Sequence, residues 1–477
     1  MKKKVFLTVV LLVLGLGAML GFRCYQQYQA RFVWIGGVRY EKDIKILELP
    51  EGLPEDPEIL LSFPALETLN LQGSGISAQE YDRVKQMLPA VQVLWEIPFQ
   101  GDYCNMFAER LTITELSEAD MELLPYFTRL RQIDAYACED YAILSGLRAR
   151  YPQVAVNYQI RIGEQSFDYS TEEITLCDAD ASRLEQVLPF FDDLKKVSFE
   201  GQLPEAEALC GLREAYPEVE FYWQVTVLGQ IADISTTELD FSGMKLESAE
   251  EIVAAVPYLP NLEKVLMMEC GLSNEQMAQL NADHQDVLFV WNVHLGQGMV
   301  LRSDATVFAP VLEWRKVYDR DLKNLRYCTE LVLIDLGHMQ ISDVSFLEYM
   351  PEVRFLILAD TNVSDLTPLS GLKKLQFLEL FISPIRDYSP LLGCTALEQL
   401  NISGTYADIE PLKQMTWLKR LWHVMWHLTP EERIALAEAL PNTLVRNPTS
   451  GSTGGGWRDC DLYYEMRDMM GLPYNVD

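Results

Sequence analysis

A leucine repeat in the C-terminal third of this chain limits its possible folds more than any other feature. Five segments start at Leu331, Val353, Leu375, Leu397 and Leu418, and successive starts are 22, 22, 22 and 21 residues apart. The first four follow one pattern, L-x-x-L-x-L-x-x-S/T-x-I/V-x-D-x-x-P-L-x-x-L-x-x. A fixed period of this length predicts a solenoid, in which each copy forms one turn and stacks on the next.

Each position of the pattern has a structural role. The first, fourth and sixth residues are predicted to point into the stack from a short strand, and the strands of successive copies to pair in parallel. In one copy these residues are Leu375, Leu378 and Leu380. Hydroxyl side chains follow in the turn, where they can bond backbone groups. They are Thr361, Ser383 and Thr405. Thr367 and Pro368 are typical of an N-cap followed by proline at the first helical position, which predicts a short helix on the outer side.

These copies resemble the bacterial leucine-rich repeats of the internalin type. The resemblance covers residues 331–421, with departures at Met339, which replaces the hydroxyl residue, and at a deletion near Ala407. It implies an α/β fold: a leucine-rich-repeat solenoid with parallel β-strands on the concave side and short helices on the convex side. Protein recognition is the usual role of internalin-like repeats, although a fold alone does not fix a function.

A longer and weaker repeat fills the middle of the chain. Its leucines are 64, 64 and 68 residues apart, at Leu66, Leu130, Leu194 and Leu262. An aromatic residue follows each leucine after 28 or 29 residues, and we expect these rings to lie in the core. They are Trp95, Tyr158, Trp223 and Trp291, and the glycines that follow them are Gly101, Gly163, Gly229 and Gly296. Each long unit is predicted to hold two strand-plus-helix turns, giving about eight degenerate leucine-rich turns in parallel order.

The two repeats predict the organisation of the chain. The expected segments are a signal or membrane anchor at 1–22, an N-terminal capping half unit at 23–57, the long repeats at 58–298, a junction at 299–326, the regular repeats at 327–440, and a C-terminal loop with an aromatic tail at 441–477.

The N-terminus has the pattern of an export signal or of one membrane-spanning helix. Three lysines, Lys2 to Lys4, precede residues 5–22, which carry no charge. The sequence around Cys24 matches a cleavage site and a lipoprotein box poorly, which favours an uncleaved anchor over a cleaved signal. Because the lysines should stay in the cytoplasm, we expect a single-pass plasma-membrane protein with the bulk of the chain extracellular, or a secreted one if the helix is cleaved.

Charge and cysteine content exclude several classes of function. The formal net charge is −31, from 70 acidic and 39 basic residues, so a nucleic acid would be repelled. Nine widely spaced cysteines without a C-x-x-C pair indicate neither a zinc site nor a dense disulfide framework. Cys328 and Cys394 lie just before repeat-starting leucines and are predicted to be small buried side chains.

Candidate catalytic and metal-binding motifs are incomplete. His423 and His427 lie four residues apart, but Val424 stands where a zincin has glutamate. Residues 451–456 are glycine-rich without the lysine of a phosphate-binding loop, and Asp178 and Asp180 lack the other oxygen ligands of a calcium loop. We therefore expect no enzyme activity, no catalytic residue, no metal and no cofactor.

The predicted binding surface is the concave side of the regular repeats. Alternation along each strand sends the third, fifth and seventh residues away from the leucine core. Several of these are large apolar side chains, and exposed apolar patches with aromatic anchors often mark partner sites. The predicted ligand-binding residues are Leu333, Asp335, Phe355, Ile357, Phe377, Glu379, Phe381, Asn401, Arg420 and Trp422.

An alternative reading leaves this surface closed. The tail carries the aromatic residues Trp457, Tyr463, Tyr464 and Tyr474, and it could fold back and cover the same strands. The two readings differ in whether the patch meets solvent.

The sequence therefore favours a non-catalytic, extracytoplasmic scaffold that binds a protein or, as a weaker expectation, a glycan, and that reaches the membrane through its N-terminal helix. One alternative is a cell-envelope enzyme or enzyme accessory with a site near the C-terminal end. Another is a structural surface-layer component.

Overall fold

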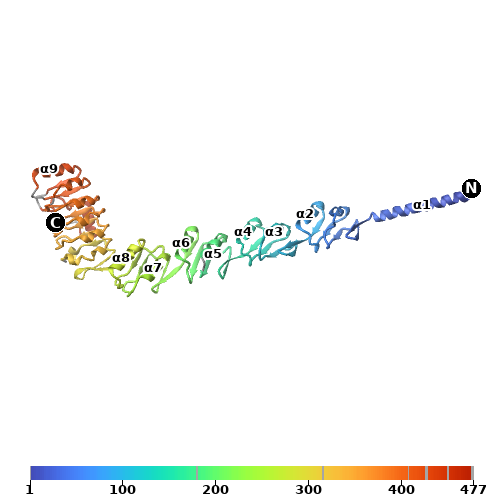
Figure 1. The fold of residues 1–477 in the computed structure, drawn as a ribbon, viewed down its shortest axis with the longest axis horizontal. Coiled ribbons are helices and arrows are strands. Elements are labelled where there is room, and N and C mark those ends of the chain that lie inside the picture. Colours follow the sequence, from blue (N-terminus) through green and yellow to red (C-terminus); the bar gives the residue numbers. More distant parts are fainter. Residues whose placement is uncertain are drawn as a thin grey trace. The chain divides into compact units, whose positions relative to one another are not determined.

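The computed structural model describes residues 2–178, 181–313, 316–406, 408–424, 428–447 and 451–473, with side chains of the first helix described from Leu12 onward. The chain divides into two compact units, Met1–Trp223 and Gln224–Asp477. Within each unit, short strands and helices alternate along the sequence and stack turn upon turn (Figure 1). The chain is thus an α/β leucine-rich-repeat solenoid.

The first unit begins with the helix α1 (Lys2–Gln29), which is longer than the predicted apolar segment 5–22. It continues through the polar residues Arg23, Gln26 and Gln29. The membrane-spanning helix predicted here is not found: in the described part of the chain, no helix combines the length and the apolar character that a span requires.

Three parallel sheets form the framework of the first unit, and each has three strands. The first sheet is β3 (Ile46–Glu48), β4 (Thr68–Asn70) and β5 (Gln92–Leu94). The second is β8 (Arg110–Thr112), β9 (Gln132–Asp134) and β10 (Ala155–Asn157). The third is β13 (Glu173–Cys177), β14 (Lys196–Glu200) and β15 (Glu220–Tyr222).

Short helices connect the parallel strands of the first unit. They are η1 (Pro57–Ser62), α2 (Ala78–Met87), α3 (Glu118–Leu123), η2 (Leu124–Tyr126), α4 (Tyr141–Arg150), α5 (Ala181–Val187), η3 (Leu188–Phe190) and α6 (Ala206–Ala215), where η denotes a 3-10 helix. Two of the α-helices begin with a full capping box, in which Ser77 and Ser117 exchange hydrogen bonds with Glu80 and Asp120. Polar start signals thus fix where these helices begin.

Antiparallel hairpins separate the three-stranded sheets. Those of the first unit are β1 (Phe32–Ile35) with β2 (Val38–Glu41), β6 (Glu96–Phe99) with β7 (Asp102–Asn105), and β11 (Gln159–Ile162) with β12 (Gln165–Asp168). The prediction of about eight turns in one parallel order is therefore wrong, because a hairpin interrupts the parallel pairing after every third strand. The repeating glycines explain this: Gly101 and Gly163 lie in hairpin turns with φ of 81° and 60°.

The second unit starts with one more long repeat. It contains β16 (Gln224–Val227), β17 (Gln230–Asp233), β18 (Glu238–Asp240), α7 (Glu250–Ala255), η4 (Val256–Tyr258), β19 (Lys264–Leu266), α8 (Asn274–Asp283), β20 (Leu288–Val290), β21 (Asn292–His294), η5 (Gly296–Gly298) and β22 (Val300–Arg302). The recurring aromatic residues of the long repeats are buried in both units, as predicted: Trp95, Tyr158, Trp223 and Trp291.

A seven-stranded parallel sheet forms the rest of the second unit. Its strands are β23 (Val307–Phe308), β24 (Leu333–Asp335), β25 (Phe355–Ile357), β26 (Phe377–Glu379), β27 (Gln399–Asn401), β28 (Arg420–Trp422) and β29 (Leu444–Arg446). The other elements are η6 (Pro310–Glu313), η7 (Asp319–Asp321), η8 (Leu325–Tyr327), η9 (Ser345–Tyr349), η10 (Thr367–Leu369), η11 (Ser389–Gly393), η12 (Leu412–Gln414), α9 (Pro430–Ala439) and α10 (Asp461–Met469). The predicted regular array is thus confirmed as a parallel stack, with one strand more at each end.

The core of the regular repeats follows the leucine pattern. Leu375, Leu378 and Leu380 are fully buried, and they belong to one apolar core that extends from Val227 to Leu440. Cys328 and Cys394 are also fully buried in this core, as predicted, and burial raises the pKa of both thiols to about 12. All nine cysteines are free.

The turn hydroxyls bond the backbone as predicted. Thr361 Oγ1 and Ser383 Oγ both donate to Leu358 O, at 2.8 and 2.7 Å, and Thr405 Oγ1 donates to Ile402 O at 2.5 Å. The predicted N-cap is wrong: η10 begins at Thr367 itself, and the cap position, Leu366, has no side-chain capping bond. The Thr367 N–H is instead bonded to Asp365 Oδ1, which accepts it at 2.8 Å. The aspartate of the repeat pattern is therefore the residue that starts the outer turn.

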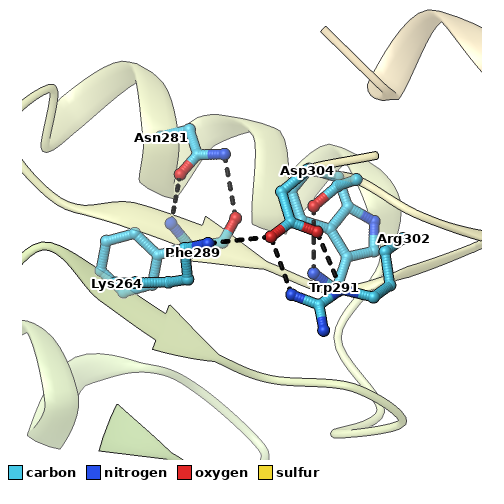
Figure 2. A network of polar contacts seen from close by, with 7 residues as sticks. Lys264, Asn281, Phe289, Trp291, Arg302 and Asp304 are labelled. Atoms are coloured by element: carbon cyan, nitrogen blue, oxygen red, sulfur yellow. Dashed lines mark hydrogen bonds and ion pairs between the residues drawn. The ribbon is translucent and has the colours of Figure 1, made fainter. Parts of the chain in front are cut away.

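Within the described part of the predicted junction, side chains bond to the last long repeat (Figure 2). Asp304 accepts hydrogen bonds from Lys264 Nζ at 3.0 Å and from Arg302 Nε and Nη2 at 2.8 and 2.7 Å. The buried Ser303 Oγ accepts the Trp291 N–H at 3.1 Å. Because β23 pairs with β24, the junction forms the first rung of the regular array rather than a break before it.

Candidate functional site

The residues predicted to bind a ligand are aligned in rows on one face of the seven-stranded sheet. The third-position row runs in register through Leu333, Phe355, Phe377, Gln399 and Arg420. The fifth-position row runs through Asp335, Ile357, Glu379, Asn401 and Trp422. We call these two rows the sheet face. Strand alternation places both rows opposite the leucine core. Their apolar members belong to a second apolar cluster: Leu333, Phe355, Ile357, Phe377 and Trp422.

The sheet face is covered, so its predicted exposure to solvent is wrong. Residues 451–473, which we call the C-terminal tail, lie against it, and Trp457, Tyr463 and Met466 complete its apolar cluster. The sheet side of that cluster is Leu333, Phe355, Ile357, Ala359, Phe377, Phe381 and Trp422, all buried. The alternative reading of the sequence, in which the aromatic tail folds back, is confirmed for Trp457 and Tyr463. Tyr464 is exposed and packs against Tyr463 of the same helix, whereas Tyr474 lies outside the described residues.

Trp457 anchors the tail at the centre of this surface. Its side chain is fully buried, with ring centroids 5.1 Å from Phe377 and 5.4 Å from Trp422. The indole N–H donates to the carboxyl group of Glu379, and the Arg420 guanidinium lies 5.5 Å from the indole centroid. A large ring that is fully desolvated and bonded at its polar end is typical of an interface anchor.

The first part of the tail is held through its backbone. The carbonyl oxygens of Ser452 and Gly454 accept from Asn401 Nδ2 and Trp422 Nε1, each at 2.9 Å. A third carbonyl, that of Gly456, accepts from Arg420 Nη2. The glycine-rich segment considered for phosphate binding is thus a peptide bound on the sheet face.

The helix α10 covers the apolar end of the sheet face. Tyr463 and Met466 are buried, and the ring of Tyr463 lies 6.3 Å from that of Phe377. At the edge of the helix, Arg354 Nη1 donates to Glu465 Oε1 at 2.7 Å, and the same guanidinium bonds Gln376. Half-exposed ion pairs of this kind contribute on the order of 0–1 kcal/mol, so they set position more than affinity.

Two carboxyl groups lie on the sheet face near the tail: Glu379 is buried and Asp335 is partly buried. Burial raises the pKa of Glu379 to about 7, against the lowering effects of the Trp457 hydrogen bond and of Arg458. Burial also raises the pKa of Asp335, whose Oδ1 accepts the Gly337 N–H at 2.9 Å. The carboxyl group of Glu379 thus faces the indole of Trp457.

The remaining sequence candidates have structural roles where the structure describes them. His423 is buried, and desolvation lowers its pKa to about 4, so it is a neutral packing residue at ordinary pH. Asp178 Oδ1 accepts the Gln202 N–H at 2.6 Å, while His427 and Asp180 lie outside the described residues. Among the residues that are described, no group of three or more His, Cys, Asp or Glu side chains is placed to hold a metal ion.

Sequence reasoning missed Arg354, which bonds Glu465 of the tail from outside the predicted rows, and Gln376, whose Oε1 accepts from Arg354. Arg354 and Gln376 occupy second positions of their repeats, which alternation alone assigns to the core side. One signal was available in the tail itself. Tyr463, Met466 and Met470 follow helical spacing, which predicts an apolar helix face in need of a partner surface.

Comparison with known proteins gives similarities of fold. No family model and no curated protein matches the chain. Among solved structures, internalin C2 of Listeria monocytogenes is 24% identical, with 29% of this chain and 73% of that chain covered and a TM-score of 0.22. A second internalin of the same organism is 14% identical, with 87% and 91% covered and a TM-score of 0.27. A leucine-rich-repeat protein of Leptospira interrogans is 14% identical, with 85% and 96% covered and a TM-score of 0.24. At these identities a likeness concerns the fold and says nothing about what the chain binds.

Proposed function

We propose that this chain is a non-catalytic, extracytoplasmic scaffold of a bacterial cell surface, and that it binds a protein segment on the sheet face. One observation carries the proposal: the sheet face already holds a polypeptide, the C-terminal tail, through a buried indole, three backbone carbonyls and an ion pair. The predicted ligand-binding residues are the ones that make or border these contacts. The outside location rests on the lysine-rich N-terminus before residues 5–22.

The chemistry of the sheet face fits a protein partner. Its centre is aromatic and aliphatic, while its edges carry Arg354 and Arg420, and protein interfaces favour this distribution. Bonds to backbone carbonyls are specific to a polypeptide, which places a protein ahead of a glycan. A net charge of −31 places nucleic acid last.

On this proposal, the tail and an external ligand compete for one surface. A ligand that must displace an intramolecular segment binds more weakly than its contacts alone would give, in proportion to the fraction of chains whose tail is released. Weakening the tail should therefore strengthen the binding of a peptide added from outside.

A synthetic peptide with the sequence of residues 451–473 tests the proposal by fluorescence anisotropy. We expect weak binding to the unchanged full-length chain and clearly tighter binding to the Trp457→Ala chain, whose own tail has lost its anchor. Adding Arg354→Glu to that chain should weaken binding of the peptide, because it replaces the 2.7 Å ion pair with Glu465 by a repulsion. A peptide with Glu465→Arg should restore the binding, since it forms the pair again with the charges exchanged.

The matched control is Arg386→Glu, which changes an exposed arginine outside the sheet face. It should leave peptide binding unchanged. If the Trp457→Ala chain, shown to be folded by circular dichroism, does not bind the peptide, or binds it equally with and without Arg354→Glu, the sheet face is not the binding surface.

A further inference from the structure

The two halves of the sheet face differ in chemistry. The strands β24 to β26 present Leu333, Phe355 and Phe377 to α10, whereas β27 and β28 present polar groups. The donors on these later strands are the Asn401 amide, the Arg420 guanidinium and the Trp422 indole N–H. The polar half therefore offers hydrogen bonds, and it offers them to the glycine-rich part of the tail.

This part of the tail is recognised by its main chain. The bonded carbonyls belong to Ser452, Gly454 and Gly456, which are two residues apart, and each meets a different side chain of the sheet face. Glycine carbonyls carry no side-chain information. The sheet face thus recognises the backbone conformation of this segment rather than its side chains.

That conformation requires glycine at defined positions. Gly451, Gly455 and Gly456 have φ of 101°, 64° and 87°, a region that other L-residues rarely adopt. A side chain at Gly456 would also place its Cβ 3.3 Å from Asp459 Oδ2. The buried ring of Trp457 follows directly and closes the segment against Phe377 and Trp422.

Three buried polar atoms on β27, on β28 and in the turn after β27 have no hydrogen-bond partner among the described residues. They are Gln399 Oε1, Arg420 Nη1 and Ser403 Oγ. Gln399 and Ser403 are 6% and 1% exposed. Burying a polar atom without a partner costs about 1–3 kcal/mol, so a segment with side-chain donors or acceptors at these places would fit better than the chain's own.

We propose that the strands β26 to β28 form a subsite for a glycine-rich segment of another protein that ends in tryptophan, and that residues 451–457 are its internal occupant. The inference rests on the proposed function and names the chemistry of the ligand. The partner segment supplies main-chain carbonyls to Asn401, Trp422 and Arg420, an indole to the Glu379 carboxyl, and polar side chains to Gln399 and Ser403. The α10 half of the tail is a separate, apolar contact.

Short peptides separate the two halves. The probe is a fluorescent peptide with the sequence of residues 451–459, and the receptor is the full-length Trp457→Ala chain. We expect saturable binding of this peptide. Replacing the two glycines equivalent to Gly455 and Gly456 by alanine should weaken binding by about tenfold or more, because both positions need positive φ.

The matched control peptide carries Ser452→Ala, which keeps the bonded carbonyl at a position that already holds an L-residue. It should bind as well as the unchanged peptide. Replacing the indole by alanine should abolish binding, and Asn401→Ala in the receptor should weaken it, whereas Arg386→Glu should not.

The outcomes separate this inference from the proposed function. If a peptide of residues 458–473 binds the receptor and the glycine-rich peptide does not, the sheet face binds proteins but the glycine-rich subsite does not exist. Equal binding of the alanine and glycine peptides would also overturn it. A second readout needs no added ligand: Gly455→Ala with Gly456→Ala in the full chain should lower the hydrogen-exchange protection of residues 451–457, and Ser452→Ala should not.

Discussion

Glu379 is the residue on which the contact between tail and sheet face depends most directly. Its side chain is 3% exposed, and its carboxyl accepts the Trp457 indole N–H. The charged groups that act on it are Arg458 of the tail, Asp335 of β24 and His338 of the following loop. Burial outweighs them and raises its pKa to about 7, so the group holds a proton under mildly acidic conditions.

We therefore expect the tail to bind more weakly as the pH rises. The folded pKa of this acid lies above its unfolded value, so the folded state binds more protons, and stability falls between about pH 4.5 and 7. The full effect is on the order of 3 kcal/mol. Hydrogen-exchange protection of residues 451–473 should decrease from pH 5 to pH 8.

The variant Glu379→Gln provides the control, because its amide oxygen can still accept the indole N–H while the side chain has no charge to desolvate. Its protection should fall less from pH 5 to pH 8 than that of the unchanged chain, with the remaining dependence due to Asp335, whose pKa is also raised by burial. At pH 8 its protection should be higher than that of the unchanged chain. A pH dependence of equal size in both chains would show that another group is responsible.

For single residues, the sequence predicted which side chains lie on the sheet face better than it predicted whether they are buried. The period and the strand alternation identified which residues form the rows of the sheet face, since both follow from the leucines alone. They did not reveal that Glu379 is buried, because it lies against Trp457, which is 78 residues further along the chain. Contacts of such sequence separation leave no local periodic signal.

Among the elements, the hairpins between the three-stranded sheets depend on their turn glycines. Gly163 joins β11 to β12 with a φ of 60°, and no heavy atom lies within 4 Å of the place where its Cβ would be. A substitution there changes backbone conformation without a steric clash. A substitution at Gly163 therefore measures only the conformational cost of placing a side chain at positive φ.

We expect Gly163→Ala to destabilise the first unit by about 1–2 kcal/mol, and Gly163→Asn to cost less, because asparagine tolerates positive φ better than alanine. Urea unfolding monitored by circular dichroism measures both. Gly146→Ala is the matched control: this glycine lies in α4, also has free space around it, and should gain up to about 1 kcal/mol from the better helix propensity of alanine. Equal effects at the two sites would mean that the turn conformation is not required.

The hairpins also show where sequence reasoning about elements stopped. The four glycines were found by their spacing, but a two-residue loop such as Gln100 and Gly101 between two short extended runs is itself a hairpin signal. Short strands of three or four residues give too little alternation to separate a hairpin from one more parallel turn. Only the turn residues, such as Gln100 and Gly101, could have distinguished a hairpin from a parallel turn.

At the scale of the whole chain, the two compact units predict two unfolding transitions. Leu69 is fully buried in the first unit and Leu378 in the second. Truncation of a buried leucine to alanine costs about 2–5 kcal/mol. We expect Leu69→Ala and Leu378→Ala each to move one transition in differential scanning calorimetry and to leave the other in place. A single transition that both variants shift alike would contradict this division.

The regular array was the part of the whole molecule that the sequence predicted best. Four copies of one pattern fixed the parallel stack, its core and its turn hydroxyls, because every copy repeats the same local interactions. The N-terminal span was not found, and the long repeats were predicted with the wrong pairing. Both errors concern stretches where composition was informative but the pattern was weak.

The hairpin after every third strand also bears on how such a chain changes length. Each hairpin ends the hydrogen bonding of one parallel sheet before the next sheet begins. A block of roughly 64 residues therefore contains a complete sheet and the hairpin that separates it from the next one. Gene duplication could then add or remove a whole block without shifting the register of its neighbours. The number of blocks could thus change while the C-terminal repeats and the segment that covers them stay unchanged.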